Sequence, residues 1–570
     1  MRLKRNVRLL ESTVRRALAR PLLSSQCNRR RFASSSAAYP EQIAVLGGGI
    51  SGLASAHFVA KEFPNSNITV FESAKEAGGW LRSRRTAVPG GDVVFEYGPR
   101  TLRPGLSSVA TIADLQLQDN VLFTKSTSPA AKNRYIYYPD RLNRMPSGGI
   151  EYLNTLKLLQ SGVFDGALNI IAEPWKPRRP SNLTDESIGS FISRRMDRRI
   201  AQNLLSALMH GIYAGDIWQL SARTLLPMLW QLEGQFNSVI GGMLQINMND
   251  QRSDMLVPIH PYDLESFKAM SEEIEANQEW GQNFIEGLAG CSTFAFKDGL
   301  QQLSRRLQDT LEKNKQVEIR MESRVQSYKM AEGNPQQVQV ITGEGASQAS
   351  QNFDLVISTL PNKTLTPYVT VMTVNLYYPN PNLIPVSGFG YLIPQSVPFE
   401  QNPERALGVI FDSDAVHGQD SVDGTKITVM LGGHWWNGWQ GYPDEDEGAE
   451  LAKSVIHRHL GIADEPAACH VNLHHDCIPQ YTVGYEDRLK LYAEELQLNF
   501  RGKVRVVGNQ YNGVGVNDCV KAAWNLAREL RGDGWKSRSC GLDRVLDTRP
   551  WTVEPVMKTT VAHRLGQKDV

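Results

Sequence analysis

A short stretch near the N-terminus has the residue types and spacing needed to bind a dinucleotide. Gly47-Gly48-Gly49-Ile50-Ser51-Gly52 satisfies the pattern G-x-G-x-x-G, and Glu72-Ser73 begins twenty residues after Gly52. The glycines permit a tight turn and let the backbone approach a pyrophosphate, whose charge the free N–H groups of a helix N-terminus can accommodate. The carboxylate of Glu72 can accept hydrogen bonds from ribose hydroxyls. These residues predict chemistry on a bound dinucleotide.

The segments around these residues read as the strand, turn and helix that must hold them. Residues 43–46 form a short apolar run typical of a buried strand, and a helical pattern follows the glycines as far as Ala60. A second apolar run over 68–71 ends at Glu72. A glycine triplet alone is weak support, because many such turns bind nothing. The complete unit favours a dinucleotide site over a purely structural turn.

A second pair of glycines distinguishes between two dinucleotides. Gly78 and Gly79 come soon after the acid and before Trp80, where they let the chain pass close to a bound diphosphate. This favours FAD over NAD. The sequence contains no second G-x-G-x-x-G motif, so it predicts no separate nicotinamide domain. Electrons are then expected to pass to oxygen or to another small acceptor.

Five further motifs follow in order along the chain. They are GGW at 78–80, GPR at 98–100, NRY at 133–135, YAGD at 213–216 and GVGVND at 513–518. Together they resemble the protoporphyrinogen oxidase family of flavoproteins, whereas the glycine fingerprint alone is shared with amine oxidases and carotenoid desaturases. The resemblance covers residues 41–533. It implies FAD-dependent oxidation of protoporphyrinogen IX to protoporphyrin IX in haem biosynthesis, with oxygen as the acceptor.

The fold implied by this resemblance is mixed α/β. A Rossmann-like FAD-binding domain is interleaved with a substrate domain and a helical, membrane-associating domain. Three other interpretations stay open. The chain could be another flavin amine oxidase or desaturase of the same fold, or a catalytically impaired variant. It could also be a flavin-free binding protein related to the Rab escort proteins, although the intact glycines and GVGVND argue against this.

The family's domain order divides the chain into interleaved pieces. The FAD-binding domain takes 41–105, 286–365 and 477–533, and the substrate-binding domain takes 106–139, 216–285 and 366–476. Residues 140–215 read as the helical domain. Four of its arginines fall largely off the apolar stripe: Arg194, Arg195, Arg198 and Arg199. The tail 534–570 lies outside the resemblance and has no clear periodicity.

The cofactor contacts implied by the resemblance come from several separate segments. Arg100 is expected to offset charge on the cofactor, with a surface arginine as the alternative. Val325 is expected at the adenine end, and Trp435 near the flavin, where a core position is equally open. The full set is Gly47, Gly48, Gly49, Ile50, Ser51, Gly52, Glu72, Ser73, Gly79, Trp80, Gly98, Pro99, Arg100, Thr101, Val325, Trp435, Val514, Gly515 and Val516.

The substrate side of the implied site has four residues. Arg134 matches the family residue that meets a substrate carboxylate, which a guanidinium can engage with two hydrogen bonds. From the residues alone it reads as a solvated loop charge. The backbone at Gly211 is expected to face the substrate opposite the flavin, with a helix cap as the alternative. Phe389 and Tyr391 are candidate cavity-lining residues that read equally well as core.

The first forty residues have the composition of a mitochondrial presequence. They contain nine Arg and one Lys against one Glu, so they contribute +9 to the formal net charge of +1 and leave −8 for 41–570. A nucleic-acid arm or a secretory signal fits less well, because the basic run stops at the first strand and no apolar core of signal-peptide length is present. We expect cleavage after Phe32 and no nucleic-acid partner. The resemblance implies peripheral attachment to the mitochondrial inner membrane, on its intermembrane-space face.

Residues 155–179 are the candidate membrane-docking segment. They combine apolar side chains, a tryptophan and terminal basic residues, although an ordinary packed helix pair is equally open. No stretch approaches twenty apolar residues, so no spanning helix is expected. The six cysteines lack C-x-x-C pairs, so neither a disulfide framework nor a metal site is indicated. The resemblance leaves open a homodimer and handover of the product to ferrochelatase.

The chain departs from the family after a buried strand at 353–360. Only residues 361–365 separate this strand from the next apolar segment, whereas the family has a longer, helix-containing connection that helps to wall the substrate cavity. A parallel crossover normally needs a dozen or more residues. Either this connection is truncated, which would affect substrate binding but not FAD binding, or the two strands belong to different sheets.

Overall fold

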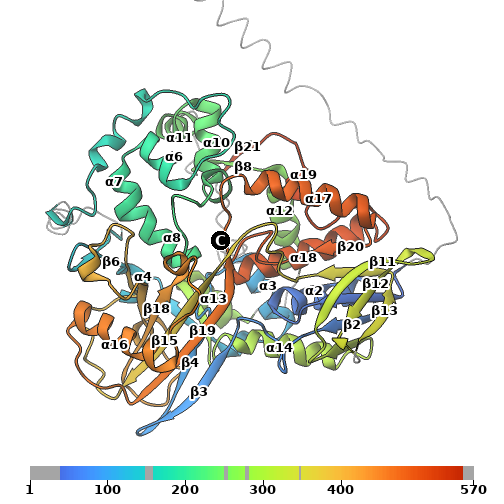
Figure 1. The fold of residues 1–570 in the computed structure, drawn as a ribbon, viewed down its shortest axis with the longest axis horizontal. Helices are drawn as coiled ribbons and strands as arrows, with labels where there is room; N and C mark the ends of the chain where they lie inside the picture. The colour runs from blue at the N-terminus through green and yellow to red at the C-terminus, as the bar shows by residue number, and fades with distance from the viewer. Residues whose placement is uncertain are drawn as a thin grey trace, which may run out of the picture. The chain divides into compact units, whose positions relative to one another are not determined.

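Two sheets organise the protein in a computed structural model that describes residues 39–147, 158, 160–248, 255–276, 281–345 and 348–555 (Figure 1). The first sheet is parallel and has the strand order β10-β2-β1-β14-β20. In that order the strands are Val317–Arg320, Asn67–Phe71, Gln42–Leu46, Leu355–Ser358 and Val504–Val506. The two strands expected around the glycine motif are therefore confirmed as β1 and β2.

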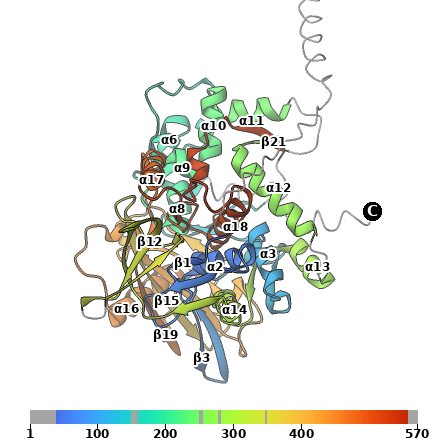
Figure 2. The ribbon, with the colours of Figure 1, turned by 90° about the vertical axis from the view of Figure 1, so that its right-hand side faces the viewer.

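Alternate residues of β1 pack into different layers. Ile43 and Val45 pack in one core with α2 (Ile50–Glu62), α14 (Gln301–Glu312) and α18 (Val516–Gly532), and Figure 2 shows α2 close to α18. Ala44 and Leu46 pack in another core with α17 (Tyr485–Phe500) and a small antiparallel sheet. That sheet consists of β11 (Val325–Ala331), β12 (Asn334–Thr342) and β13 (Ala349–Phe353). Burial of both faces explains the continuous apolar runs in the sequence.

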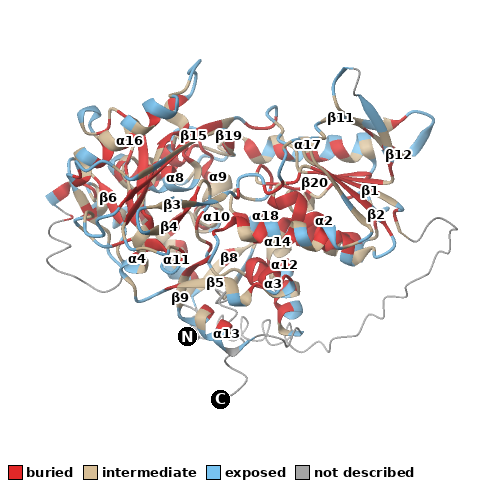
Figure 3. Ribbon diagram, turned by 90° about the horizontal axis from the view of Figure 1, so that it is seen from below, coloured by how far each residue is buried: buried red, intermediate tan, exposed pale blue. Residues whose placement is uncertain are grey.

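The second sheet has the order β19-β15-β18-β17-β16-β6-β7. In that order its strands are Ala468–Pro479, Tyr368–Tyr378, Thr425–Gly432, Ala406–Phe411, Gly390–Leu392, Tyr135–Tyr137 and Leu142–Arg144. Neighbouring strands are antiparallel except for β16 and β6, which run parallel. The helix α16 (Glu445–Leu460) packs against this sheet, and β15 is buried along nearly its whole length (Figure 3).

The short connection after β14 joins the two sheets. β14 belongs to the parallel sheet and β15 to the seven-stranded sheet. No parallel crossover is therefore required between them, and the second of the two explanations for the short connection is confirmed. Thr366 Oγ1 donates a hydrogen bond to the Gln480 carbonyl, and Gln510 Oε1 accepts one from Asn362 N at 2.6 Å. These contacts fix the connection at both ends.

The helical pattern expected over 140–215 is found only in part. Its described residues begin with strand β7 and continue through two 3₁₀ turns, at Ala167–Ile170 and Glu173–Trp175. Gly162 and Gly166 have φ of 79° and 81°, a left-handed conformation that interrupts a helix. The helices that follow are α6 (Ile188–Arg195), α7 (Arg198–Ile200), α8 (Ser206–Tyr213), α9 (Ala222–Leu225), α10 (Pro227–Phe236) and α11 (Val239–Met248), with a π segment at Ala201–Leu205.

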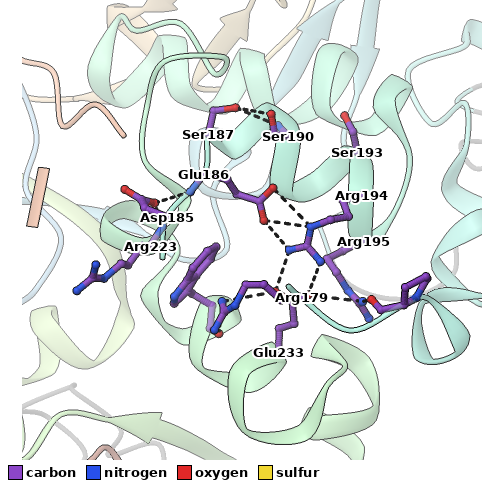
Figure 4. Close-up of polar contacts among 12 residues, drawn as sticks. Arg179, Asp185, Glu186, Ser187, Ser190, Ser193, Arg194, Arg195, Arg223 and Glu233 are labelled. Atoms are coloured by element: carbon purple, nitrogen blue, oxygen red, sulfur yellow. Dashed lines mark hydrogen bonds and ion pairs between the residues drawn. The ribbon is translucent and has the colours of Figure 1, made fainter. Parts of the chain in front are cut away.

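The structure corrects the amphipathic interpretation of this region at Arg194 and Arg195. The Arg194 guanidinium lies between the carboxylates of Glu186 and Glu233, each at 2.5 Å (Figure 4). Arg195 is fully buried, and its guanidinium pairs with Glu173, which is also fully buried. Arg195 therefore lies on the buried face of α6 with Phe191 and Ile192, and acidic partners on neighbouring segments compensate both arginines.

The remaining described elements include the tail that the sequence left unassigned. Two-stranded ladders pair β3 (Ser83–Val88) with β4 (Gly91–Glu96), β5 (Val121–Lys125) with β9 (Cys291–Phe296), and β8 (Leu256–Ile259) with β21 (Thr552–Pro555). The tail also forms α19 (Asp543–Leu546), and Arg544 pairs with Asp263 of α12 (Pro261–Ala276) at 3.1 Å. The other helices are α3 (Leu106–Asp114), α4 (Pro129–Lys132), α13 (Gln282–Gly290) and α15 (Asp412–Ala415). Within the described ranges, no helix is both long and apolar enough to cross a membrane.

Candidate functional site

The glycine motif forms the turn from β1 into α2. Gly47 has φ of 101°, a conformation that other residues rarely adopt. A Cβ atom at Gly52 would lie 1.8 Å from the Gly47 carbonyl oxygen, so only glycine fits where the helix crosses the turn. Gly49 is the N-cap of α2 and has no side chain to cap the first N–H groups of the helix. These groups are therefore available to an anion.

Gly78 and Gly79 pass directly beside this turn. Gly78 N donates to the Gly48 carbonyl at 2.8 Å, and Gly49 and Gly78 form a parallel bridge. A Cβ atom at Gly79 would lie 3.1 Å from Gly49 Cα. The two glycine segments therefore form a backbone surface without side chains, as a diphosphate requires for close approach.

Glu72 lies at the C-terminal end of β2 and faces the same turn. Its Oε2 accepts a hydrogen bond from Gly48 N at 2.7 Å, and its Oε1 accepts one from Ser73 Oγ at 3.2 Å. The Glu72 carbonyl accepts from Ser323 N at 2.7 Å, two residues before Val325. Glu72 is thus held beside the backbone surface of the two glycine segments, and the start of β11 lies close to Glu72. This arrangement is the one expected at the adenosine end of a dinucleotide.

The loop that contains Gly98, Pro99, Arg100 and Thr101 lies between the second glycine pair and the start of α18. A Cβ atom at Gly98 would be 2.2 Å from the Trp80 carbonyl oxygen, so the loop touches the segment after Gly79. Further along, the Arg103 carbonyl accepts a hydrogen bond from Asn517 Nδ2 at 2.9 Å. The structure therefore brings three distant segments of the sequence together around the two glycine segments.

The start of α18 completes this convergence. Gly515 is its N-cap and Val516 its first residue, with Val514 immediately before them. Val516 and Cys519 in the first turn of α18 pack in the same buried core as Ile50 in the first turn of α2. The backbone around Gly515 is thus held beside the glycine motif.

Arg100 has a partner within the protein. Its Nη1 donates to Asp412 Oδ1 at 2.7 Å, and Thr428 Oγ1 donates to the other carboxylate oxygen at 2.5 Å. Arg100 is buried, so it is not the solvated surface arginine of the alternative interpretation. This ion pair connects the loop at residues 98–101 to α15, which lies beside the seven-stranded sheet. A role for Arg100 toward the charge of the cofactor remains a prediction.

On the substrate side, Gly211 is exposed in the last turn of α8. The residue that caps this helix in a left-handed conformation is Ala214, with φ of 49°, so the cap alternative for Gly211 is wrong. A Cβ atom at Gly211 would lie 3.0 Å from two carbon atoms of the Leu392 side chain. Glycine therefore lets α8 lie close to the strand β16.

The other three substrate candidates differ in position. The Arg134 guanidinium lies over the Phe389 ring, 5.1 Å from its centroid. Tyr391 instead lies in the core of the seven-stranded sheet, only 2% exposed, and its hydroxyl is hydrogen-bonded to His459 at 3.0 Å. The core interpretation is therefore the correct one for Tyr391, because its neighbours leave no free face for a ligand.

Sequence reasoning did not single out a buried histidine pair beside Gly211. His210 Nε2 lies 2.8 Å from His434 Nε2, and His210 Nδ1 lies 2.6 Å from the Ile393 carbonyl oxygen. Burial, and next the electrostatic interaction with His434, lowers the pKa of His210 to about 3. Burial also lowers the pKa of His434, to about 4. The pair is therefore neutral at physiological pH and ties α8 to the segment that carries Trp435. The only sequence signal was that each histidine directly precedes a candidate site residue.

The residues present fit FAD. The glycine segments present backbone without side chains where a diphosphate would bind, and Glu72 lies beside them, as ribose binding requires. Five buried side-chain polar atoms have no hydrogen-bond partner among the described residues, and two of them, Trp435 Nε1 and Asn517 Oδ1, lie on segments predicted to contact the cofactor. Such orphaned groups are costly in a folded protein and are accounted for if a bound polar ring system supplies their partners.

Comparisons with known proteins identify the family of the chain. The family model described as flavin containing amine oxidoreductase matches residues 50–531. A protoporphyrinogen oxidase of Schizosaccharomyces pombe is 32% identical, over 86% of this chain and 98% of the relative. The human protoporphyrinogen oxidase is 29% identical, over 86% and 98%.

A solved structure shares the fold. The crystal structure of a protein from Exiguobacterium sp. 255-15, provisionally named a protoporphyrinogen oxidase, matches with a TM-score of 0.64 at 20% identity, over 86% of this chain and 99% of that chain. The predicted mixed α/β fold of a flavin oxidoreductase is confirmed. The chain belongs to the flavin-containing amine oxidoreductases and, within them, to the protoporphyrinogen oxidase family.

Proposed function

We propose that this FAD enzyme oxidises protoporphyrinogen IX to protoporphyrin IX, with oxygen as the acceptor, in haem biosynthesis. The observation that carries the proposal is the 32% identity to a protoporphyrinogen oxidase across nearly its full length. The convergence of the two glycine segments, Glu72 and the start of α18 supports FAD as the cofactor. Another amine oxidase or desaturase activity has no comparable support.

FAD, when bound, would accept the hydrides that the porphyrinogen loses, so that six electrons leave the substrate in three two-electron cycles. The glycine cradle and Glu72 would hold its diphosphate and ribose. Arg134 would bind a propionate of the substrate, and the Phe389 ring beneath the guanidinium would contribute an apolar surface for the macrocycle. The backbone at Gly211 would orient the ring system. Such positioning in an apolar site lowers the barrier without a side-chain base.

The test is direct. The purified mature chain should show a bound flavin spectrum, and addition of protoporphyrinogen IX under air should produce porphyrin fluorescence well above the rate of autoxidation. Bound FAD without enzymatic porphyrin formation would contradict the proposed activity and leave the family membership intact.

We also propose that the protein attaches to a membrane surface through an apolar patch formed by Leu168, Ile171 and Trp175. These side chains are 79%, 69% and 81% exposed, although they lie within eight residues of one another. Clustered exposure of this kind is unusual on a soluble surface. The exposed Arg178 lies three residues after Trp175 and suits anionic headgroups.

Vesicle binding tests the patch. A variant with Ile171→Ser and Trp175→Ser should lose most of its sedimentation with phosphatidylcholine–phosphatidylglycerol vesicles. Leu498→Ser is a matched control, because Leu498 is 76% exposed on α17, outside the patch. Equal binding by the patch variant and the wild type would exclude this surface. A mitochondrial presequence with cleavage after Phe32 is part of the same proposal and lies outside the described residues; N-terminal sequencing of the imported chain tests it.

The remaining expectations also belong to this proposal. The location on the intermembrane-space face of the inner membrane, the homodimer and the handover to ferrochelatase rest on the family resemblance. The division into FAD-binding, substrate-binding and helical domains has the same basis. The packing of α12 is relevant here, because Met270 and Ile274 lie in the apolar core around α2 and α18. We therefore propose that the 261–276 part of the substrate-domain assignment belongs with the FAD-binding domain.

A further inference from the structure

A row of polar side chains on the seven-stranded sheet holds the backbone that leads into the loop at residues 98–101. Asn375 Nδ2 donates a hydrogen bond to the Glu96 carbonyl at 3.0 Å, and Thr373 Oγ1 donates one to the Tyr97 carbonyl at 2.9 Å. Both donors lie on β15, two positions apart, so their side chains extend from the same face of the sheet. The sheet therefore fixes the main chain just before a segment that is predicted to contact FAD.

His474 adds a third contact from the neighbouring strand β19. It is paired with Val371 of β15, so its side chain extends from the same face as those of Thr373 and Asn375. Its Nε2 lies 2.8 Å from the Tyr97 carbonyl oxygen. Because a carbonyl oxygen only accepts, this nitrogen carries a proton and donates it. Burial lowers the pKa of His474, so the ring is neutral at physiological pH, with its proton on Nε2.

The imidazole of His474 also contacts a second segment that is predicted to bind FAD. The ring centroids of His474 and Trp80 are 5.4 Å apart, and the ring planes are perpendicular. Trp80 follows Gly79, which passes close to Gly49 of the glycine motif. Within the described ranges, Trp80 makes no other ring contact, and it is 43% exposed. His474 therefore supports one part of the indole and leaves the rest accessible.

The two segments that His474 contacts also lie against each other. A Cβ atom at Gly98 would lie 2.2 Å from the Trp80 carbonyl oxygen, and Tyr97 N donates to the Arg82 carbonyl at 2.9 Å. Both contacts are made by the backbone, so neither of them holds the indole ring. His474 is the side chain that joins the ring of Trp80 and the carbonyl of Tyr97 to the seven-stranded sheet.

His470, four residues earlier on β19, has different partners. Its ring nitrogens lie 3.2 Å from Thr86 Oγ1 and 3.2 Å from Tyr97 Oη, and its ring centroid lies 5.2 Å from that of Phe95. These partners belong to the β3–β4 ladder and to the residue that follows it. His470 therefore offers a matched comparison with His474, because it has the same side chain on the same face of the same strand but contacts only this ladder.

We propose that His474 is a positioning residue for the flavin. It acts through Trp80 and the loop at residues 98–101, and with one side chain it sets the places of both relative to the seven-stranded sheet. The hydrogen bond to a backbone carbonyl and the perpendicular ring contact are each favourable. The inference needs FAD as the cofactor but no particular substrate, so its failure and the failure of the proposed activity are separate outcomes.

Three substitutions separate the two contacts of His474. His474→Gln keeps an N–H donor near the position of Nε2 but removes the ring, His474→Phe keeps a ring but removes the donor, and His474→Leu removes both. Loss of one contact should raise the dissociation constant of FAD by about 2- to 10-fold, and loss of both by more. At saturating FAD, the visible circular dichroism of the bound flavin should change most in His474→Leu, because this signal reports how the protein surrounds the isoalloxazine ring.

Two control variants test for a general loosening of the sheet. His470→Leu removes a histidine from the same face of β19, and His475→Leu alters an exposed neighbour on the other face. Both should retain the FAD affinity and the flavin circular dichroism of the wild type. Smaller changes in His474→Gln and His474→Phe than in His474→Leu, with both controls at the wild-type level, would support the proposal.

Wild-type FAD affinity and circular dichroism in His474→Leu would overturn the proposal. An equal change in His470→Leu would also overturn it, because the effect would then come from the sheet as a whole. If His474→Leu does not fold, His474→Gln and His474→Phe are compared with the two controls by the same criteria.

Discussion

Glu173 is the residue whose replacement tests the packing of the helical region most sharply. Its buried carboxylate accepts hydrogen bonds from Ser238 Oγ at 2.5 Å, Arg195 Nε at 2.7 Å, Val239 N at 2.9 Å and Ile240 N at 3.1 Å. It therefore caps the first turn of α11 and neutralises a buried arginine at the same time. We predict that Glu173→Gln loosens both α11 and the 3₁₀ turn that carries Trp175.

The expected loss of stability follows from the burial of the Glu173–Arg195 ion pair. Breaking a buried ion pair by removing one partner costs about 3–5 kcal/mol. Glu233 lies 3.6 Å from Arg195 and keeps part of its charge compensated, so we expect the lower end, about 3 kcal/mol. Since about 1.4 kcal/mol corresponds to a factor of ten, local opening should become roughly 100-fold more frequent.

Hydrogen–deuterium exchange measures this opening directly, and it does not require the whole chain to unfold in one step. Amides of α11 should exchange roughly 100-fold faster in Glu173→Gln, while those of β1 should be unchanged. The control Glu332→Gln removes an exposed partner of Lys329 and should leave exchange unchanged. The double variant Glu173→Leu/Arg195→Met should recover only the part of the protection that the ion pair supplies, because apolar residues can replace a buried ion pair but leave the amides of Val239 and Ile240 without their acceptor. Wild-type exchange in the single variant would refute the reasoning.

The pKa of Glu173 also predicts how the stability of the protein depends on pH, including the direction of the change. Burial alone would raise the pKa of Glu173, but the hydrogen bonds from Ser238, Val239, Arg195 and Ile240 outweigh it and hold the pKa below the ordinary value of 4.5. Its contribution is therefore fully present above pH 4.5 and is lost as the pH falls through the lower value in the folded protein. The difference in urea stability between wild type and Glu173→Gln should shrink in that range. A constant difference down to acid pH would contradict this.

Three further predictions concern other parts of the molecule. Gly52→Ala should abolish FAD retention on purification, because its Cβ would lie 1.8 Å from a carbonyl oxygen of the glycine turn; a normal flavin ratio would contradict this. Burial lowers the pKa of His210 to about 3 and the pKa of His434 to about 4. The free energy of unfolding in urea should therefore fall between pH 6.5 and pH 4, by up to ~1.4 kcal/mol per pH unit for each histidine. The fall should be less steep in His434→Asn. Truncation after Pro550 should speed exchange in β8, which loses its partner strand, whereas truncation after Pro555 should not; equal exchange would exclude a role for β21.

The cofactor side could be predicted because its signals are local. Strands expected at 43–46 and 68–71 appear as Gln42–Leu46 and Asn67–Phe71, and the glycines occupy the turn that their spacing requires. Glycine there is dictated by backbone conformation and close approach, which depend on nearby residues only. A short motif with such strict steric demands indicates its structure directly.

The features that sequence reasoning missed depend on distant partners. Arg195 is buried because Glu173, twenty-two residues earlier, lies beside it, and no periodicity shows that. Tyr391 lies in the core because β16 is flanked by both β17 and β6. The tail could not be assigned, since its strand β21 pairs with β8, nearly three hundred residues away in the sequence. In each case the decisive contact is long-range.

The order of strands in the parallel sheet has a consequence for how the protein is made. β1 and β2 come from the beginning of the chain, but β14 spans Leu355–Ser358 and β20 spans Val504–Val506. A ribosome must therefore synthesise most of the polypeptide before the sheet can close, and α18 emerges later still. We therefore expect the nascent chain to retain no flavin until these segments have been made, and the exposed edge of β1 to need protection until then. On this reasoning, cofactor loading is expected to follow synthesis of nearly the whole chain.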